Sequence, residues 1–216
     1  MDINIMGVKM NDTVLYLARM LQAAGGSILI RDYTRLRELS YCIPSLKGLN
    51  PANDIVDYAG IGYTYSSSSS ERYDTCIRLY DFDRVPDYED CLTLVIADES
   101  RMVCEKLTEI DWSDFLDAGT KIVLLIKDYI GTVRKQYDDF MKNAGINNAF
   151  AIKCDRDHDW KCAILAEYND NFIFTNISNS YKEALRNVFR IIRSDLKLSD
   201  KETEKLFDKA AKGGKK

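Results

Sequence analysis

A short segment near the start of the chain carries the residue types that bind phosphate groups. It reads GVKMNDT, from Gly7 to Thr13, and directly follows the apolar run at residues 2–6. Glycine lets backbone N–H groups turn toward an anion, lysine supplies positive charge, and a hydroxyl group binds Mg²⁺ beside a phosphate. Gly7, Lys9 and Thr13 provide one of each, so the segment is a candidate nucleotide-binding loop.

A second set of candidates is acidic. Asp32 follows the apolar run at 27–30, and Asp81 and Asp83 follow the run CIRLY at 76–80. Carboxylates are ligands that Mg²⁺ takes from proteins, and ligands of open α/β sheets bind at the carboxyl ends of the strands. Two interpretations of the three aspartates stay open, a metal site and a purely structural role.

The elements that would position these residues alternate between strand and helix. Apolar runs predict strands at 2–6, 27–30, 76–80, 91–97, 121–126 and 148–154. Helical spacing predicts helices at 13–24, 101–107, 132–143 and 180–196. This alternation predicts an α/β fold with three layers, a mainly parallel central sheet with helices on both faces. Residues 1–198 are expected to form a single domain, followed at 199–216 by a C-terminal helical extension with a lysine-rich tail.

Composition narrows the classes of partner. The 216 residues carry a net charge of −4, which gives no general attraction to nucleic acid, so no nucleic-acid partner is expected. No apolar run approaches the roughly 18 residues of a membrane-spanning helix, so we expect no integral membrane association. The start, MDINIMG, lacks a signal-peptide pattern and the six cysteines form no C-x-x-C pair, which favours a reduced, cytoplasmic protein. The single histidine, His158, has no metal-ligand spacing around it.

Three segments together resemble the MinD/ParA family of SIMIBI-class P-loop ATPases. INIMGVKMNDTVLYLARML is similar to the family's first strand, phosphate-binding loop and helix, and SILIRDYT to its second strand, which ends in aspartate. YDTCIRLYDF and PDYEDCLTLVIADES are similar to the strand whose last aspartate serves magnesium, and to the apolar strand that follows. The resemblance covers residues 1–195. It implies the P-loop NTPase fold and a cofactor site at Gly7, Lys9, Asn11, Asp12, Thr13, Asp32 and Asp81.

The phosphate-binding loop departs from the family's pattern, G-x-x-x-x-G-K-[ST]. Gly7 is the one glycine left, Asn11 stands in place of the lysine, and Asp12 in place of the first hydroxyl residue. An aspartate there would direct negative charge at a phosphate, and like charges ~4 Å apart cost about 4 kcal/mol at an effective dielectric near 20. A micromolar ligand binds with only about 8 kcal/mol. This degenerate Walker A loop predicts a protein without ATP hydrolysis and without a bound cofactor.

The resemblance and the damaged loop together imply a pseudo-ATPase. The first hypothesis is a non-catalytic interaction or localisation module that forms a homodimer and serves a bacterial assembly such as a pilus or secretion system. The alternative is a nucleotide-binding protein or weak ATPase that uses ATP and Mg²⁺ with Lys9 and the cluster of Asp32, Asp81 and Asp83. The family often has a second lysine that reaches the partner subunit's nucleotide, and Lys9 lies about where that residue belongs. The other interpretation of Lys9 is that it is simply a solvated lysine of the loop.

The sequence also bears on two further classes of protein. A receiver domain would need an acidic pair directly after the first strand, and this chain has Gly7-Val8-Lys9 there, although Lys127 after the run KIVLLI matches the lysine of receivers. An unrelated Rossmann-like enzyme with its site in the tyrosine-rich region 54–82 remains a third possibility.

Overall fold

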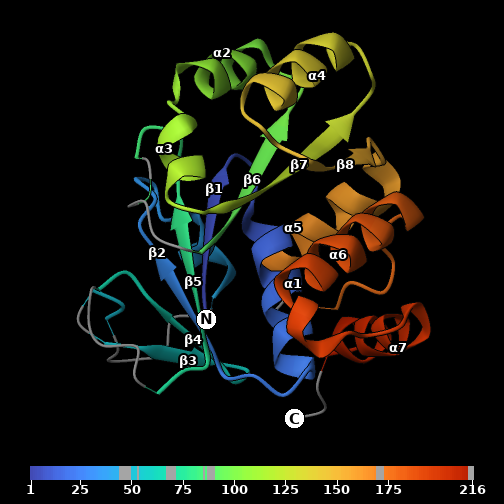
Figure 1. The fold of residues 1–216 in the computed structure, drawn as a ribbon. Helices are drawn as coiled ribbons and strands as arrows, with labels where there is room; N and C mark the ends of the chain where they lie inside the picture. Colours follow the sequence, from blue (N-terminus) through green and yellow to red (C-terminus); the bar gives the residue numbers. More distant parts are fainter. Residues whose placement is uncertain are drawn as a thin grey trace.

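The structure is a computed structural model that describes residues 1–43, 50–52, 54–66, 72–84, 86, 91–168 and 173–213. Its centre is a sheet of eight strands in the order β3-β4-β2-β5-β1-β6-β7-β8 (Figure 1). The strands are β1 (Asp2–Gly7), β2 (Ile28–Asp32), β3 (Val56–Tyr58), β4 (Ile61–Thr64), β5 (Thr75–Tyr80), β6 (Leu92–Asp98), β7 (Lys121–Tyr129) and β8 (Asn148–Lys153). Neighbouring strands are parallel except β3 and β4, which form an antiparallel hairpin at one edge.

Helices cover both faces of this sheet. They are α1 (Asn11–Ala23), α2 (Arg101–Glu109), α3 (Ser113–Asp117), α4 (Arg134–Asn143), α5 (Lys161–Tyr168), α6 (Asn179–Ile192) and α7 (Asp200–Ala211), with the short turns η1 (Glu38–Cys42), η2 (Arg156–Trp160) and η3 (Ser194–Leu196). In Figure 1, α2, α3 and α4 lie together on one side and α1, α5, α6 and α7 on the other. The predicted three-layer α/β fold is confirmed.

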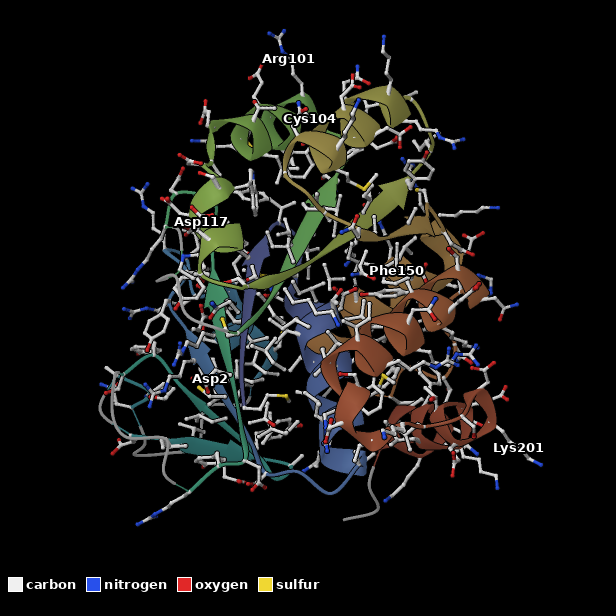
Figure 2. The ribbon with its side chains drawn as sticks, viewed as in Figure 1. Asp2, Arg101, Cys104, Asp117, Phe150 and Lys201 are labelled. Carbon is white, nitrogen blue, oxygen red and sulfur yellow. The ribbon has the colours of Figure 1, made fainter. Side chains whose placement is uncertain are left out.

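The central strands are apolar because both of their faces are buried. Along β6, Leu94 and Ile96 belong to the hydrophobic cluster under α1 and α6, whereas Val95 and Ala97 belong to the cluster under α2 and α4. Such two-sided burial explains why parallel strands read as continuous apolar runs. Figure 2 shows the side chains that fill both layers, with Arg101 and Lys201 at the surface.

The last helix begins where the sequence predicts a helical extension. Ser199 and Glu202 form a capping box, in which each side chain accepts a hydrogen bond from the other residue's backbone N–H. α7 packs against α1, and the ring of Phe207 meets that of Phe174 edge-on at 5.4 Å between centroids. The extension therefore shares the main core, and the division at residue 198 stays a prediction.

The tyrosine-rich region contains both buried and partly buried tyrosines where it is described. Tyr63 in β4 and Tyr80 at the end of β5 are buried, as strand packing requires. Most of the serine run, 67–70, lies outside the described residues. Among the helices that the structure describes, none combines the length and the apolar character needed to cross a membrane.

Candidate functional site

The connection between β1 and α1 is shorter than the predicted loop. β1 ends at Gly7 and α1 begins at Asn11, so only residues 8–10 join them. The loop motif has four residues between its two glycines alone, and it presents a series of backbone N–H groups to the phosphates. α1 begins two residues earlier than the predicted helix, so Asn11, Asp12 and Thr13 form its first turn, and their part in a cofactor site stays a prediction.

Two amide groups of this segment are occupied by the protein itself. Gly7 has a φ of +144°, and a Cβ added to it would lie 1.9 Å from the carbonyl oxygen of Ile96. Only glycine therefore allows β1 to lie this close to β6. The N–H of Val8 donates to the same carbonyl oxygen at 3.1 Å, and the N–H of Thr13 donates to the carboxylate of Asp12 at 2.8 Å. Neither N–H is free to bind a phosphate.

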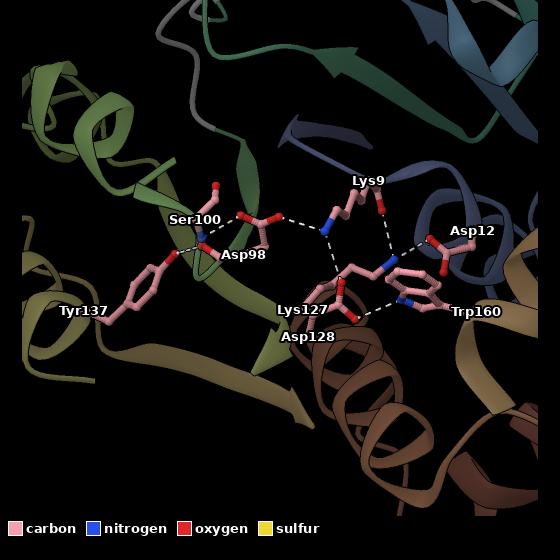
Figure 3. A network of polar contacts seen from close by, with 8 residues as sticks. All are labelled: Lys9, Asp12, Asp98, Ser100, Lys127, Asp128, Tyr137 and Trp160. Atoms are coloured by element: carbon pink, nitrogen blue, oxygen red, sulfur yellow. Dashed lines mark hydrogen bonds and ion pairs between the residues drawn. The ribbon is translucent and has the colours of Figure 1, made fainter. Parts of the chain in front are cut away.

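Lys127, near the end of β7, reaches into the connection. Its ammonium lies 2.6 Å from Oδ1 of Asp12 and 2.9 Å from the carbonyl oxygen of Lys9 (Figure 3). The hydroxyl of Tyr181 donates to Oδ2 of Asp12 at 3.0 Å. All three side chains of Lys127, Asp12 and Tyr181 are buried. The sequence predicts that Asp12 directs a negative charge at a phosphate. The structure differs, because Lys127 neutralises Asp12 and their ion pair lies directly after the β1–α1 connection.

Lys9 is also held by carboxylates of its own chain. Its ammonium lies 2.9 Å from Asp98 and 3.2 Å from Asp128, as Figure 3 shows. Burial alone would lower the pKa of Lys9, but its contacts with the two aspartates raise it. For Asp98, burial would raise the pKa, and the hydrogen bonds from Ser100 and Lys9 lower it. Lys9 and Asp98 are therefore both ionised at neutral pH. Lys9 would have to leave this ion pair before it could reach another subunit.

A cavity of about 270 Å³ lies beside this network. Among the predicted site residues, Lys9, Asn11 and Asp12 line it. The rest of its wall comes mainly from η1, the end of β7, η2, α5 and α6. Trp160 in η2 forms part of the wall, and its indole Nε1 donates to Asp128 at 3.3 Å. The cavity is thus built from elements on both sides of the β1–α1 connection.

The three aspartates of the alternative site have separate partners. Asp32 is buried and accepts hydrogen bonds from Thr34 and Tyr63, and its pKa is raised, chiefly by burial. Asp81 accepts the backbone N–H of Arg35, while Asp83 forms an ion pair with Lys106 at 3.0 Å. None of the three lines the cavity. Within the described ranges, no group of three or more His, Cys, Asp or Glu side chains could hold a metal ion.

The sequence interpretation placed only Lys9, Asn11 and Asp12 of the wall at the site. The polar and aromatic wall residues that it did not place there include Glu38 of η1, Lys127 of β7, and Asp159 and Trp160 of η2. Lys127 left a signal in the sequence, since it directly follows an apolar run, and a lysine there needs a buried acceptor.

Comparisons with known proteins agree with the fold. No protein-family model and no curated protein matches the sequence. Among solved structures, a chain of the MinC:MinD cell division protein complex of Aquifex aeolicus has a TM-score of 0.60 at 12% identity, covering 92% of this chain and 97% of that one. The MinD cell division protein of Aquifex aeolicus gives 0.57 at 11%, covering 92% and 98%. The ParA family ATPase of Chlorobium tepidum gives 0.53 at 10%, covering 97% and 96%.

These identities are too low to transfer an activity, and they show the fold alone. The similarity extends over nearly the whole of both chains in each comparison. It agrees with the strand order and with the two helical layers described above. The chain therefore has the fold of the MinD and ParA ATPases, as its sequence predicted.

Proposed function

We propose that this chain is a non-catalytic, MinD/ParA-like protein that acts as an interaction or localisation module in the cytoplasm. The observation that carries the proposal is the ion pair of Lys127 and Asp12, 2.6 Å apart, in the first turn of α1 directly after a connection of three residues. An active loop needs open N–H groups and a lysine directed at the phosphates. Here the lysine position is Asn11, and the nearest buried lysine is bound to an internal carboxylate.

The charge and size of the cavity also disfavour ATP with Mg²⁺. Four carboxylates and two lysines line the cavity, a net charge of −2 that would repel a triphosphate. Its volume of about 270 Å³ is below the 300–1,000 Å³ of pockets that hold drug-sized ligands. The residues present therefore do not fit a bound nucleotide.

Exposed apolar side chains around the cavity support a protein partner. Trp160 and Ile164 of the cavity wall are 45% and 52% exposed, and Leu36 and Tyr41, which are 70% and 79% exposed, are close in sequence to the wall residues Glu38 and Cys42. We call Leu36, Tyr41, Trp160 and Ile164 the apolar rim. Large apolar and aromatic side chains at a surface are typical anchors of interfaces. The solved MinC:MinD complex is an assembly of a protein with this fold and a protein partner.

We propose a homodimer that pairs through the apolar rim and serves a bacterial assembly such as a pilus or secretion system. The pairing is tested by sedimentation of the wild type, Ile164→Glu and Met102→Glu. Met102 is 60% exposed on α2, on the opposite side of the sheet, so its variant controls for the added charge. Only Ile164→Glu should sediment as a monomer. A wild type that remains monomeric at its solubility limit, or equal effects of the two variants, would contradict the dimer.

The absence of catalysis is tested by incubating the pure protein with Mg-ATP and following phosphate release. No release above the buffer rate is expected, and calorimetry with millimolar ATP should detect no binding. Turnover that disappears in an Asp81→Asn variant would overturn the proposal, because it would place a working magnesium site at the end of β5. Asp138→Asn is the matched control, since Asp138 is exposed on α4, where it pairs with Arg134, and belongs to no candidate site.

A further inference from the structure

Two carboxylates of the cavity have no cationic partner in the described part of the chain. Asp12 pairs with Lys127, and Asp128 pairs with Lys9. Glu38 and Asp159 remain, and the ion pairs recorded for the described residues include neither. Asp159 is 7% exposed and receives hydrogen bonds only from Ser178. The net charge of −2 is therefore concentrated on these two side chains.

An orphaned polar group lies behind the same wall. The ring of Tyr16 is fully buried and its hydroxyl has no hydrogen-bond partner among the described residues. Its pKa is raised by burial and by the nearby charges of Asp12 and Asp159, both of which line the cavity. Tyr16 does not line the cavity, so the carboxylates of the wall rather than its hydroxyl would meet a guest.

The aromatic residues of the cavity already associate with cations. The Lys127 ammonium lies 5.4 Å from the ring centroid of Tyr181, and the Arg156 guanidinium lies 5.2 Å from that of Trp160. Such contacts stabilise a positive charge beside an aromatic face. Ile152 and Ala163 add apolar wall, which suits the hydrocarbon stem of a cationic group.

We propose that this cavity binds an organic cation the size of one arginine or lysine side chain. The carboxylates of Glu38 and Asp159 would accept hydrogen bonds from its guanidinium or ammonium, the Trp160 wall would contact its stem, and the volume would admit one such group. The cation has two possible sources, a free small molecule or a side chain presented by a protein partner. The inference goes beyond the proposed function, because it would hold for a protein with no macromolecular partner.

Tryptophan fluorescence provides a direct test. The chain has two tryptophans, of which Trp160 lines the cavity while Trp112 is buried in the cluster on the other side of the sheet. Butylguanidinium and N-acetyl-arginine methylamide should change the emission saturably, and added salt should weaken the binding. N-acetyl-citrulline methylamide, of nearly the same shape without the charge, should not bind. The signal should vanish in Trp160→Phe.

A charge variant identifies the carboxylate. Glu38→Gln should weaken binding of both guanidinium probes about fivefold, the effect of roughly 1 kcal/mol. Glu105→Gln removes the same charge from α2, where Glu105 pairs with Arg101, and should leave binding unchanged.

The two guanidinium probes also distinguish the sources of the cation. Binding of both probes indicates that a free cation suffices, and binding of the arginine derivative alone indicates a peptide source. Equal binding of citrulline and arginine derivatives, or no response to either guanidinium probe in a folded protein, overturns the proposal.

Discussion

At the scale of the residue, Lys127 sets the electrostatics of the site. Its ammonium contacts the carboxylate of Asp12 and the backbone carbonyl oxygen of Lys9, and it is buried together with Asp12. A buried charge without its partner is far more costly than a missing surface charge. The stability of the connection after β1 should therefore depend on this one side chain, although it lies 115 residues away from Asp12 in the sequence.

Replacing Lys127 by methionine tests this dependence. Lys127→Met keeps the stem and removes the charge, leaving Asp12 buried and unpaired, so we expect a loss of about 3–5 kcal/mol in the free energy of unfolding. The double variant Lys127→Met, Asp12→Asn should lose less than the sum of the two single losses. Urea unfolding measures all three.

The matched control is Lys106→Met. Lys106 forms exposed ion pairs with Asp83 and Glu109, so its removal should cost at most about 1 kcal/mol. Equal losses at Lys106 and Lys127 would mean that the buried pair has no special role.

At the scale of the element, the approach of β1 to β6 explains the form of the site. Gly7 lets the backbone lie against Ile96, which directs the chain straight into α1 after three residues. We expect Gly7→Ala to destabilise the protein by several kcal/mol, since the new Cβ would overlap backbone rather than a movable side chain.

Gly25→Ala separates this overlap from simple backbone strain. Gly25 also has a positive φ, +96°, but no atom lies within 4 Å of its added Cβ. Its variant should lose only on the order of 1 kcal/mol. Chemical denaturation compares the two, and similar losses would show that the close approach of β1 and β6 is unimportant.

The same elements show which parts of the protein could be predicted from the sequence. Burial on both faces makes the central strands apolar, and this local signal was sufficient to predict β1, β2, β5, β6 and β7. Strand order leaves no local signal. Asp32 ends β2 and Asp81 follows β5, on the other side of β1 from β6 and β7, so they lie away from the cavity. Lys127 and Trp160 come near the loop only through that order.

At the scale of the whole molecule, α7 joins the end of the chain to its beginning. The helix packs on α1, its residue Ala211 accepts the backbone N–H of Phe174, and Lys209 donates to the carbonyl oxygen of Ala23. Phe174 and Phe207 are both buried at this contact. A fold whose first helix depends on its last should unfold as one cooperative unit.

Truncation decides whether α7 is a dispensable extension. A chain ending at residue 198 loses Phe207 and exposes Phe174, and because burying one such side chain contributes about 1.5–3 kcal/mol, we expect a loss of at least 3 kcal/mol. A chain ending at Gly213 removes only the last three residues, predicted from the sequence to be a solvated tail, and should unfold at the wild-type urea concentration. If both truncated chains unfold like the wild type, then residues 1–198 are sufficient and the packing of α7 on α1 adds no stability. A loss confined to the shorter chain would instead place α7 within the domain, because the surface of α1 that it covers must then be buried for the protein to fold.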